Sequence, residues 1–298
     1  MDDAPADRRE RLALASARVP FRLKVAAVWV VIFAVLVGFF WLSQFDTDWM
    51  LDNLSFIAAG LRFTIAMAVG GILLAILLAG LGALGRLSSN PIAFGVSGFY
   101  ISFFRGTPLI VQMFLIYLAM PQVAGNLVDR FPTIPVEYAN FFILDAAIAG
   151  TLALGLNYGA YMTEIFRAGI QAVPRGQTEA AQALGMPEQK LFRRIVLPQA
   201  IRIIIPPTGN EFIAMMKDTA LVSFLGVTAA SAEIFRRSQL AGKADFKNLE
   251  AYVAVAMIYW GLTVLFTFFQ SRLEARIGRG YDREHVVRAM QAQAQEPH

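Results

Sequence analysis

The sequence predicts an all-α integral membrane protein with six transmembrane helices and further helices outside the bilayer. Hydrophobic residues make up 57% of the chain and charged residues only 16%, whereas soluble domains carry about 25% charged residues. The mean hydropathy is +0.54. Apolar runs also recur along the chain, and each approaches the roughly 20 residues that a membrane-spanning helix needs.

The first apolar run, Val25 to Leu42, follows a polar segment that is rich in basic residues: Arg8, Arg9, Arg11, Arg18, Arg22 and Lys24. The run is longer than the apolar part of a signal peptide, and no A-x-A cleavage site follows it. Residues 44–53 contain Asp but no Lys or Arg, as expected for an outside loop. Residues 1–45 are therefore predicted to be a cytoplasmic N-terminal tail and one transmembrane helix.

The second span is predicted at 57–84 and exits at Arg86, and a third segment runs from Pro91 to Met120. This third segment contains a predicted kink at Arg105-Gly106-Thr107-Pro108. Pro108 cannot continue the helical hydrogen bonds, and it pushes Thr107 toward extended geometry. We place Arg105 near the cytoplasmic interface, where its charge can reach water. The kink is either a gate or scaffold element of a pathway or an ordinary packing feature.

The remaining spans are predicted at 141–166, 203–227 and 251–270, joined by outside segments at 121–140 and 231–250. The fifth span begins with Pro206-Pro207 in its first turns, where proline costs least. Lys and Arg concentrate in the predicted cytoplasmic segments, so both termini are expected in the cytoplasm. The outside segment 231–250 departs from this rule, because it contains four basic residues: Arg236, Arg237, Lys243 and Lys247.

Between the fourth and fifth spans, residues 168–202 form a polar, basic segment that must lie in water. Residues 178–184 predict a short helix, and Gly185 is suited to a left-handed stop after it. Pro187 and Glu188 open a second short helix, which is expected to end at 195–198. Ala180, Ala181 and Ala183 would let another protein's backbone approach closely. The segment is therefore predicted to be a docking element.

The same segment resembles the EAA loop of ABC-importer permeases. The matching residues are Glu179-Ala180-Ala181, then Gly185 after three intervening residues, Ile195 after nine intervening residues, and Leu197-Pro198. The resemblance implies a type I importer core of five helices at 54–272, preceded by one extra span. It also implies that 168–202 is the cytoplasmic coupling loop, which inserts into a groove of an ATPase subunit. The implied coupling residues are Glu179, Ala180, Ala181, Leu184, Gly185 and Pro198.

The sequence Phe104-Arg105-Gly106-Thr107-Pro108-Leu109 resembles a motif of the polar amino-acid branch of these permeases. Ionisable residues at membrane depth are costly and are functional candidates. The fourth and fifth spans carry a polar set that is predicted to line a cavity for a zwitterionic amino acid: Asn157, Tyr161, Asn210, Glu211, Lys217, Asp218 and Thr219. The alternative is that Lys217 and Asp218 only satisfy neighbouring helices.

The residues needed for catalysis are absent from the sequence. The chain has no cysteine, and its two histidines, His285 and His298, lie in the predicted cytoplasmic C-terminal tail, 273–298. These leave almost no material for metal-based or histidine-based catalysis, and no Ser-His-Asp arrangement is possible. No G-x-x-x-x-G-K-[ST] loop for ATP occurs either. We therefore expect no catalytic residue, metal or cofactor in this chain, and its net charge of +4 does not indicate nucleic-acid binding.

The resemblance implies several partners in a bacterial cytoplasmic (inner) membrane. They are a second permease chain, identical or homologous, two ATPase subunits that bind ATP and Mg, and an extracytoplasmic solute-binding protein. Two alternatives remain open: an ion-coupled secondary carrier that uses Glu211 and Asp218, and a membrane scaffold without transport activity. The sequence does not identify the amino acid or distinguish a homodimer from a heterodimer.

Overall fold

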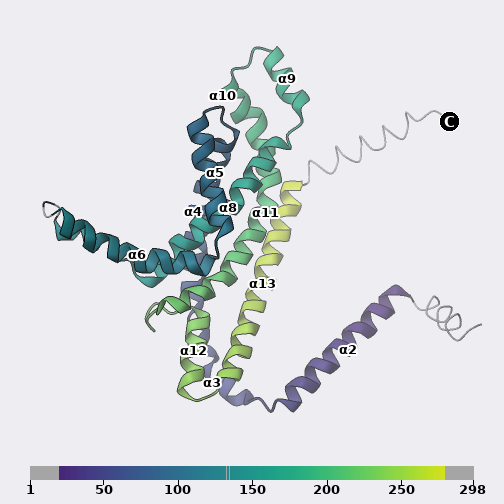
Figure 1. The fold of residues 1–298 in the computed structure, drawn as a ribbon. Coiled ribbons are helices and arrows are strands. Elements are labelled where there is room, and N and C mark those ends of the chain that lie inside the picture. The colour runs from purple at the N-terminus through teal and green to yellow at the C-terminus, as the bar shows by residue number, and fades with distance from the viewer. Residues whose placement is uncertain (1–19, 132, 134, 279–298) are drawn as a thin grey trace, which may run out of the picture. The chain divides into compact units, whose positions relative to one another are not determined.

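The computed structural model describes residues 20–131, 133 and 135–278, and every regular element within them is a helix (Figure 1). The contacts divide the chain into two units, Met1–Leu51 and Asp52–His298. Most of the predicted N-terminal tail and the C-terminal tail beyond 278, with both histidines, lie outside the described residues.

The first unit contains the predicted extra span, which is helix α2 (Phe21–Leu42). This helix is long and apolar enough to cross a membrane, and none of its residues is buried. Helix α3 (Thr47–Ala58) follows. The Asp46 carboxylate accepts a hydrogen bond from the backbone N–H of Trp49 at 2.9 Å, so it satisfies one of the free donors at the start of α3.

Two long helices pack closely in the second unit, α4 (Leu61–Leu87) and α8 (Ala146–Gln171). Glycines permit this approach. A Cβ on Gly155 would lie 2.6 Å from Leu74 Cδ2, and one on Gly82 would lie 2.5 Å from Thr163 Oγ1. Small residues of α4 such as Gly82 therefore lie against α8, as is usual where membrane helices pack.

The predicted third segment is two helices rather than one kinked helix. Helix α5 (Pro91–Gly106) ends at the predicted site, where Thr107 is extended with φ −118° and ψ 146°. Helix α6 (Leu109–Arg130) then turns away from the direction of α5 (Figure 1). The expected end at Met120 is wrong, because α6 continues through Pro121. A proline removes one helical hydrogen bond, and here the helix continues to Arg130 despite that loss.

The fourth span begins later than predicted. After the short helix α7 (Val136–Asn140), residues 141–145 are not helical and α8 begins at Ala146. The Asp145 carboxylate accepts a hydrogen bond from the N–H of Ala147 at 2.8 Å. An aspartate at this position is a strong helix start, so the Phe141-Phe142 pair, although apolar, lies before the helix.

The fifth span is part of a longer continuous helix. Helix α10 (Glu188–Leu191), a π-helical turn (Phe192–Val196) and α11 (Leu197–Asp218) follow each other without interruption. The prediction that the second docking helix ends at 195–198 is therefore wrong. Pro206 and Pro207 lie in the interior of α11, not in its first turns. A 3₁₀ segment (Thr219–Leu225) and Gly226, at φ +81°, end this run.

The last two helices are α12 (Ile234–Ala244) and α13 (Asn248–Gly278), which pack against each other. Four helices in the described part of the chain are long and apolar enough to span a membrane: α2, α4, α6 and α13. Helices α8 and α11 have comparable lengths, 26 and 22 residues, but carry more polar side chains. For these two the predicted spans remain predictions.

Candidate functional site

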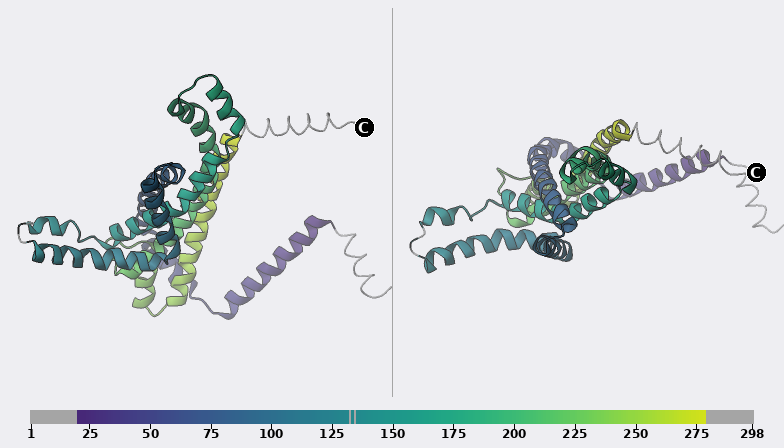
Figure 2. Two further views of the ribbon diagram at one scale, coloured as in Figure 1. Left: turned by 45° about the horizontal axis from the view of Figure 1, so that its top comes forward. Right: turned by 90° about the horizontal axis from the view of Figure 1, so that it is seen from above.

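The predicted docking element projects from one end of the bundle as two antiparallel pieces, helix α9 (Arg175–Ala183) and α10, while α12 lies toward the opposite end (Figures 1 and 2). We call residues 173–200 the knob. Gly185 has φ +75°, the left-handed geometry predicted for it. The N–H of Gly185 donates to Gln182 O at 2.8 Å, and the N–H of Met186 donates to Ala181 O at 3.1 Å. This is the Schellman pattern that ends helices at glycine.

The knob has its own apolar core, which continues into α11. The buried members of this core are Val173, Ala181, Leu191, Val196, Ala200 and Ile204. Gln199 Nε2 adds a hydrogen bond to Gln177 Oε1 at 2.6 Å, which joins α11 to α9. Because the same cluster holds α9, α10 and the start of α11, the knob and the helix behind it are packed as one body.

Part of the EAA sequence is exposed on the surface of the knob, and the rest is buried. Glu179 and Ala180 are exposed, and Leu184 at the tip is 85% exposed. Ala181 is only 6% exposed and packs inward, so it supports the knob rather than offering a surface. Leu184 therefore adds an exposed apolar side chain to the tip of the knob, beside the exposed Glu179 and Ala180.

Pro198 lies directly after the π-helical turn, near the start of α11. A proline has no N–H to bond the preceding turn, and the π-helical turn contains Arg194, whose carbonyl would accept that bond in an α-helix. The predicted coupling residue Pro198 therefore lies inside a continuous helix, at the junction between the knob and α11.

The break between α5 and α6 is held by a cluster of buried amides. Gln112 Nε2 donates to Phe104 O at 2.9 Å, to Thr107 O at 3.0 Å and to Thr107 Oγ1 at 2.7 Å. Asn157 Nδ2, from α8, donates to Phe104 O at 2.9 Å and to Gln112 Oε1 at 3.1 Å. The cluster thus bonds the carbonyls left free by the break and fixes the break to α8.

Two further predicted residues meet beside this cluster. The Arg105 guanidinium lies 5.1 Å from the centre of the Tyr161 ring, within the range of a cation–π contact. Tyr161 is 40% exposed, and no atom would lie within 4 Å of a Cβ added to Gly106. Arg105 and Tyr161 therefore form an accessible pair at the end of α5, on the exposed side of α8.

On α11 and at the start of the 3₁₀ segment that follows it, the predicted residues divide between surface and interior. Asp218 is half-buried and accepts a hydrogen bond from Tyr158 Oη at 2.9 Å. Thr219 is fully buried, and its hydroxyl donates to Met216 O at 2.8 Å. Lys217 is exposed and Glu211 is half-buried. Asn210, also exposed, accepts a hydrogen bond from Gln270 Nε2 of α13 at 3.0 Å.

The predicted pathway residues consequently fall into separate groups, and none of them lines any of three cavities of about 320, 470 and 480 Å³. Sequence reasoning missed three residues that organise these groups: Gln112, Tyr158 and Gln270. A usable signal existed, because each is a polar side chain within an apolar helix and such groups need partners. The predicted set included other uncharged polar residues, such as Asn157 and Tyr161, but omitted these three.

A fourth missed residue is Glu233, just before α12. Its side chain is fully buried, and its two oxygens accept hydrogen bonds from the N–H groups of Phe235 and Arg236, both at 2.6 Å. Tyr259 Oη donates to Glu233 Oε2 at 3.0 Å. Burial raises the pKa of Glu233 to about 7, although these hydrogen bonds favour the charged form. Glu233 thus anchors α12 to α13.

Two of the four basic residues that depart from the positive-inside pattern, Arg236 and Arg237, form hydrogen bonds in the same region. Arg236 Nε donates to Val227 O at 3.1 Å. Arg237 donates to Ala232 O at 3.2 Å and to Phe56 O at 3.2 Å, and its guanidinium lies 5.0 Å from the centre of the Phe56 ring. These two arginines have structural partners, so their position reflects packing of α12 rather than the orientation of the chain.

Comparison with known proteins agrees with this architecture. The family described as binding-protein-dependent transport system inner membrane component matches residues 71–279. The probable amino-acid ABC transporter permease protein PatM of Vibrio harveyi is 38% identical over 239 residues, 80% of this chain and 99% of that protein. The arginine transport system permease protein ArtQ of Bacillus subtilis (strain 168) is 33% identical over 232 residues, 78% of this chain and 97% of that protein.

Solved structures are similar over the same extent. The crystal structure of an amino acid ABC transporter with histidines matches with a TM-score of 0.65 and 34% identity, covering 76% of this chain and 96% of the matched chain. A methionine ABC transporter, MetNI, shares the fold with a TM-score of 0.55 at 14% identity. The chain therefore belongs to the family of inner membrane components of binding-protein-dependent transport systems.

Proposed function

We propose that this chain is the permease subunit of an ATP-driven ABC importer for polar amino acids. The observation that carries the proposal is the knob, whose EAA sequence lies at the end of the bundle and whose core is shared with α11. A rigid element of this kind transmits movement of a docked ATPase into the helices behind it. Leu184 at the tip and the exposed Glu179 and Ala180 are the proposed contact surface.

The substrate class is supported by the relatives. Proteins that match most of this chain are named for transport of arginine, L-cystine and glutamine. The polar side chains of α8, α11 and the segment that follows α11 fit such a substrate, because a zwitterion needs both charged and hydrogen-bonding partners. We propose that this polar set lines a pathway completed by a second permease chain: Asn157, Tyr161, Asn210, Glu211, Lys217, Asp218 and Thr219.

The complex we propose has a second permease chain, two ATPase subunits that carry ATP and Mg, and an extracytoplasmic solute-binding protein. The chain would cross a bacterial inner membrane six times, with both termini and the knob in the cytoplasm. In this arrangement ATP binding opens the pathway outward and hydrolysis turns it inward. We propose that α5 and α6 move in this change. The Arg105–Tyr161 pair lies at their junction, together with the break at Gly106-Thr107-Pro108.

Reconstitution tests this function directly. The permease and its ATPase partner are placed in liposomes, and ATP hydrolysis is measured with the solute-binding protein and each standard amino acid in turn. Stimulation by one group of polar amino acids, with ATP-dependent uptake of the same compounds, supports the proposal. Uptake driven by an ion gradient without ATP would indicate a secondary carrier. Partner binding without any uptake would indicate a scaffold.

A further inference from the structure

Within the proposed pathway, we infer that Arg105 binds the α-carboxylate of the transported amino acid inside the membrane and that Tyr161 holds Arg105 in position. The inference rests on the proposed function, because it assigns one step of substrate recognition to a named residue. The guanidinium of Arg105 lies 5.1 Å from the centre of the Tyr161 ring. Both side chains are exposed, so a ligand can reach them.

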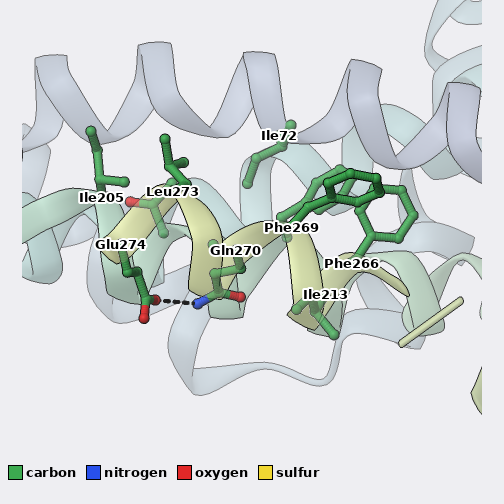
Figure 3. A pocket seen from close by; sticks show the side chains of 11 residues that line it. Ile72, Ile205, Ile213, Phe266, Phe269, Gln270, Leu273 and Glu274 are labelled. Atoms are coloured by element: carbon green, nitrogen blue, oxygen red, sulfur yellow. Dashed lines mark hydrogen bonds between the residues drawn. The ribbon is translucent and has the colours of Figure 1, made fainter. Parts of the chain in front are cut away.

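The cavities between the helices do not offer a site for a carboxylate, which needs a cationic or hydrogen-bonding partner when it leaves water. Glu274 is the only charged residue among the described residues that line the cavity of about 320 Å³. Figure 3 shows it among isoleucine, leucine and phenylalanine side chains. The described residues that line the other two cavities include no charged side chain. The carboxylate is therefore bound elsewhere.

The contacts between α5 and α8 place Arg105 deep in the membrane when α8 crosses it as proposed. Phe104 O, next to Arg105, accepts a hydrogen bond from Asn157 Nδ2 at 2.9 Å. At about 1.5 Å per residue, Asn157 lies roughly 18 Å along α8 from Asp145 and roughly 15 Å from Arg167. The hydrocarbon core of a bilayer is about 30 Å thick. Arg105 thus lies near its middle, deeper than the cytoplasmic interface expected from the sequence.

The charge of Arg105 has no acidic partner within the described part of the chain. Its contact there is the face of the Tyr161 ring, which attracts the cation but leaves the N–H donors of the guanidinium free. An ionised side chain at membrane depth is costly unless it is paired or faces water. A carboxylate matches two parallel donors of a guanidinium, so the substrate's carboxylate supplies the partner that Arg105 needs.

Helix geometry places Tyr161 between the two sides of the proposed pathway. Asn157 points toward the α5–α6 break, where it is hydrogen-bonded, and Tyr158 points toward α11, where it donates to Asp218 at 2.9 Å. At about 100° per residue, Tyr161 lies roughly 40° around α8 from Asn157 and roughly 60° from Tyr158, between these directions. The Tyr161 ring therefore lies between Arg105 and the acidic side chain on α11.

The charges on the two sides match the two ends of an amino acid. Arg105 is positive, whereas Glu211 and Asp218 are acidic, half-buried and about two turns apart on one face of α11. A zwitterion lying over Tyr161 can direct its carboxylate to Arg105 and its ammonium group toward α11. Lys217 is a second exposed cation, but it follows the acidic face of α11 and lacks the planar donor pair of an arginine.

Ligand binding in the absence of the solute-binding protein tests the inference, because that protein would contribute its own recognition. The permease–ATPase complex is placed in lipid nanodiscs with radiolabelled L-glutamine or L-arginine. Bound label is competed with the unlabelled amino acid and with its carboxamide, L-glutaminamide or L-argininamide. The carboxamides keep the ammonium group and the side chain and replace only the carboxylate. The ratio of the two competition constants therefore measures recognition of the carboxylate.

We expect the parent complex to prefer the acid by roughly tenfold or more, because the carboxamide loses a charge-assisted pair of hydrogen bonds. Arg105→Gln should weaken binding of the acid and remove the preference, and Arg105→Lys should give an intermediate ratio. Tyr161→Leu should lower the affinity for the acid, and Tyr161→Phe, which keeps the ring, should restore it. Arg62→Gln is the matched control, since the exposed Arg62 lies 4.8 Å from the centre of the Phe63 ring and should be dispensable.

A parent complex that binds neither compound, or that shows no preference for the acid, would overturn the inference. So would a preference that persists in Arg105→Gln, or one that is lost in Lys217→Gln instead. Equal weakening of acid and carboxamide by Arg105→Gln would also overturn it and would indicate an ion pair with the second permease chain. The same complexes are assayed for ATP-dependent uptake with the solute-binding protein. Uptake by the parent keeps the proposed function when the carboxylate assignment fails, and its absence overturns both.

Discussion

At the scale of single residues, Gly185 is a position where the backbone conformation favours glycine over every other residue. Its φ of +75° lies in the left-handed region, where a residue with a Cβ costs about 1–2 kcal/mol. The two hydrogen bonds that end α9 depend on that geometry. The exposed tip of the knob, with Leu184, is therefore held in place by a glycine that contacts nothing through a side chain.

Gly185→Ala should loosen the knob by about 1 kcal/mol without unfolding the bundle. We expect faster amide hydrogen exchange at Gly185 and Met186 and weaker stimulation of the partner ATPase. Gly176→Ala is the control, since Gly176 is helical with open space around it, and alanine there should stabilise α9 slightly. Equal exchange in both variants would contradict the role given to Gly185.

The buried amides at the α5–α6 break should be energetically coupled. Gln112→Leu removes the donor to Phe104 O and Thr107 O, and a buried acceptor left without a partner costs about 1–3 kcal/mol. Asn157→Leu removes the remaining donor. In a double-mutant cycle read by unfolding in detergent, we expect a coupling energy of about 0.5–3 kcal/mol. Additive effects would show that the two amides act independently.

Glu233 should make the attachment of α12 depend on pH. Its pKa is raised from 4.5 to about 7, so the folded state binds the proton more tightly than the unfolded state. The stabilisation is complete below about pH 4.5 and is lost as the pH rises through about 7. Protection factors of the Phe235 and Arg236 amides, corrected for intrinsic exchange, should fall over that interval. In the Glu233→Gln variant these protection factors should no longer fall with pH. If they still fall, another group causes the pH dependence.

At the scale of elements, the sequence predicted most helices but not where they join. The αL position of Gly185, the extended Thr107 before Pro108 and the helix start at Pro91 were readable, because glycine and proline act locally. The end of the second docking helix at 195–198 was wrong. Proline normally signals a helix boundary, but here Pro198 follows a π-helical turn and the helix continues. Val196 and Ala200 lie in one buried cluster with Ala181, which holds this part of the helix against the knob.

The candidate site was predictable to a similar degree. Residues with a local signature, such as Glu179 to Gly185, were found in the sequence, and the structure places them together on the knob. The hydrogen bonds of Asn157 were not predictable, because its partners are 45 and 53 positions away in sequence. Gln270 and Tyr158 were missed for the same reason, since they matter through contacts between distant helices.

The continuous helix from α10 to α11 should be required for coupling. Insertion of Gly-Gly between Leu197 and Pro198 introduces a flexible joint, so we expect ATP-dependent uptake to fall to the level of vesicles without ATPase. The complex should still assemble, because the knob surface is unchanged. The same insertion between Ser88 and Ser89, in the connection from α4 to α5, is the control. Undiminished uptake with the insertion after Leu197 would show that the helix need not be rigid.

At the scale of the whole molecule, the polar groups of α8 and α11 are proposed to face a second permease chain. Asp218→Asn weakens the hydrogen bond from Tyr158, and a bond to a charged group is worth about 1.5–3 kcal/mol. Uptake by this variant should therefore fall by roughly tenfold or more. Glu211→Gln should lower uptake as well, because it removes a charge from the proposed pathway. Asp129→Asn, an exposed change on α6, should leave uptake near the parent rate. Parent-level uptake in both α11 variants would remove these carboxylates from the pathway.

The most direct test of the central claim uses the absence of cysteine in the chain. Leu184→Cys places a single thiol on the tip of the knob, and Leu249→Cys places one on the 55% exposed Leu249 near the start of α13. We predict that Leu184→Cys in intact cells resists an impermeant maleimide, and that in inverted vesicles it crosslinks to a nucleotide-binding ATPase subunit. Leu249→Cys should react from outside and should not crosslink to that subunit. Labelling of Leu184→Cys from the exterior, or no nucleotide-binding protein at the knob, would contradict the account.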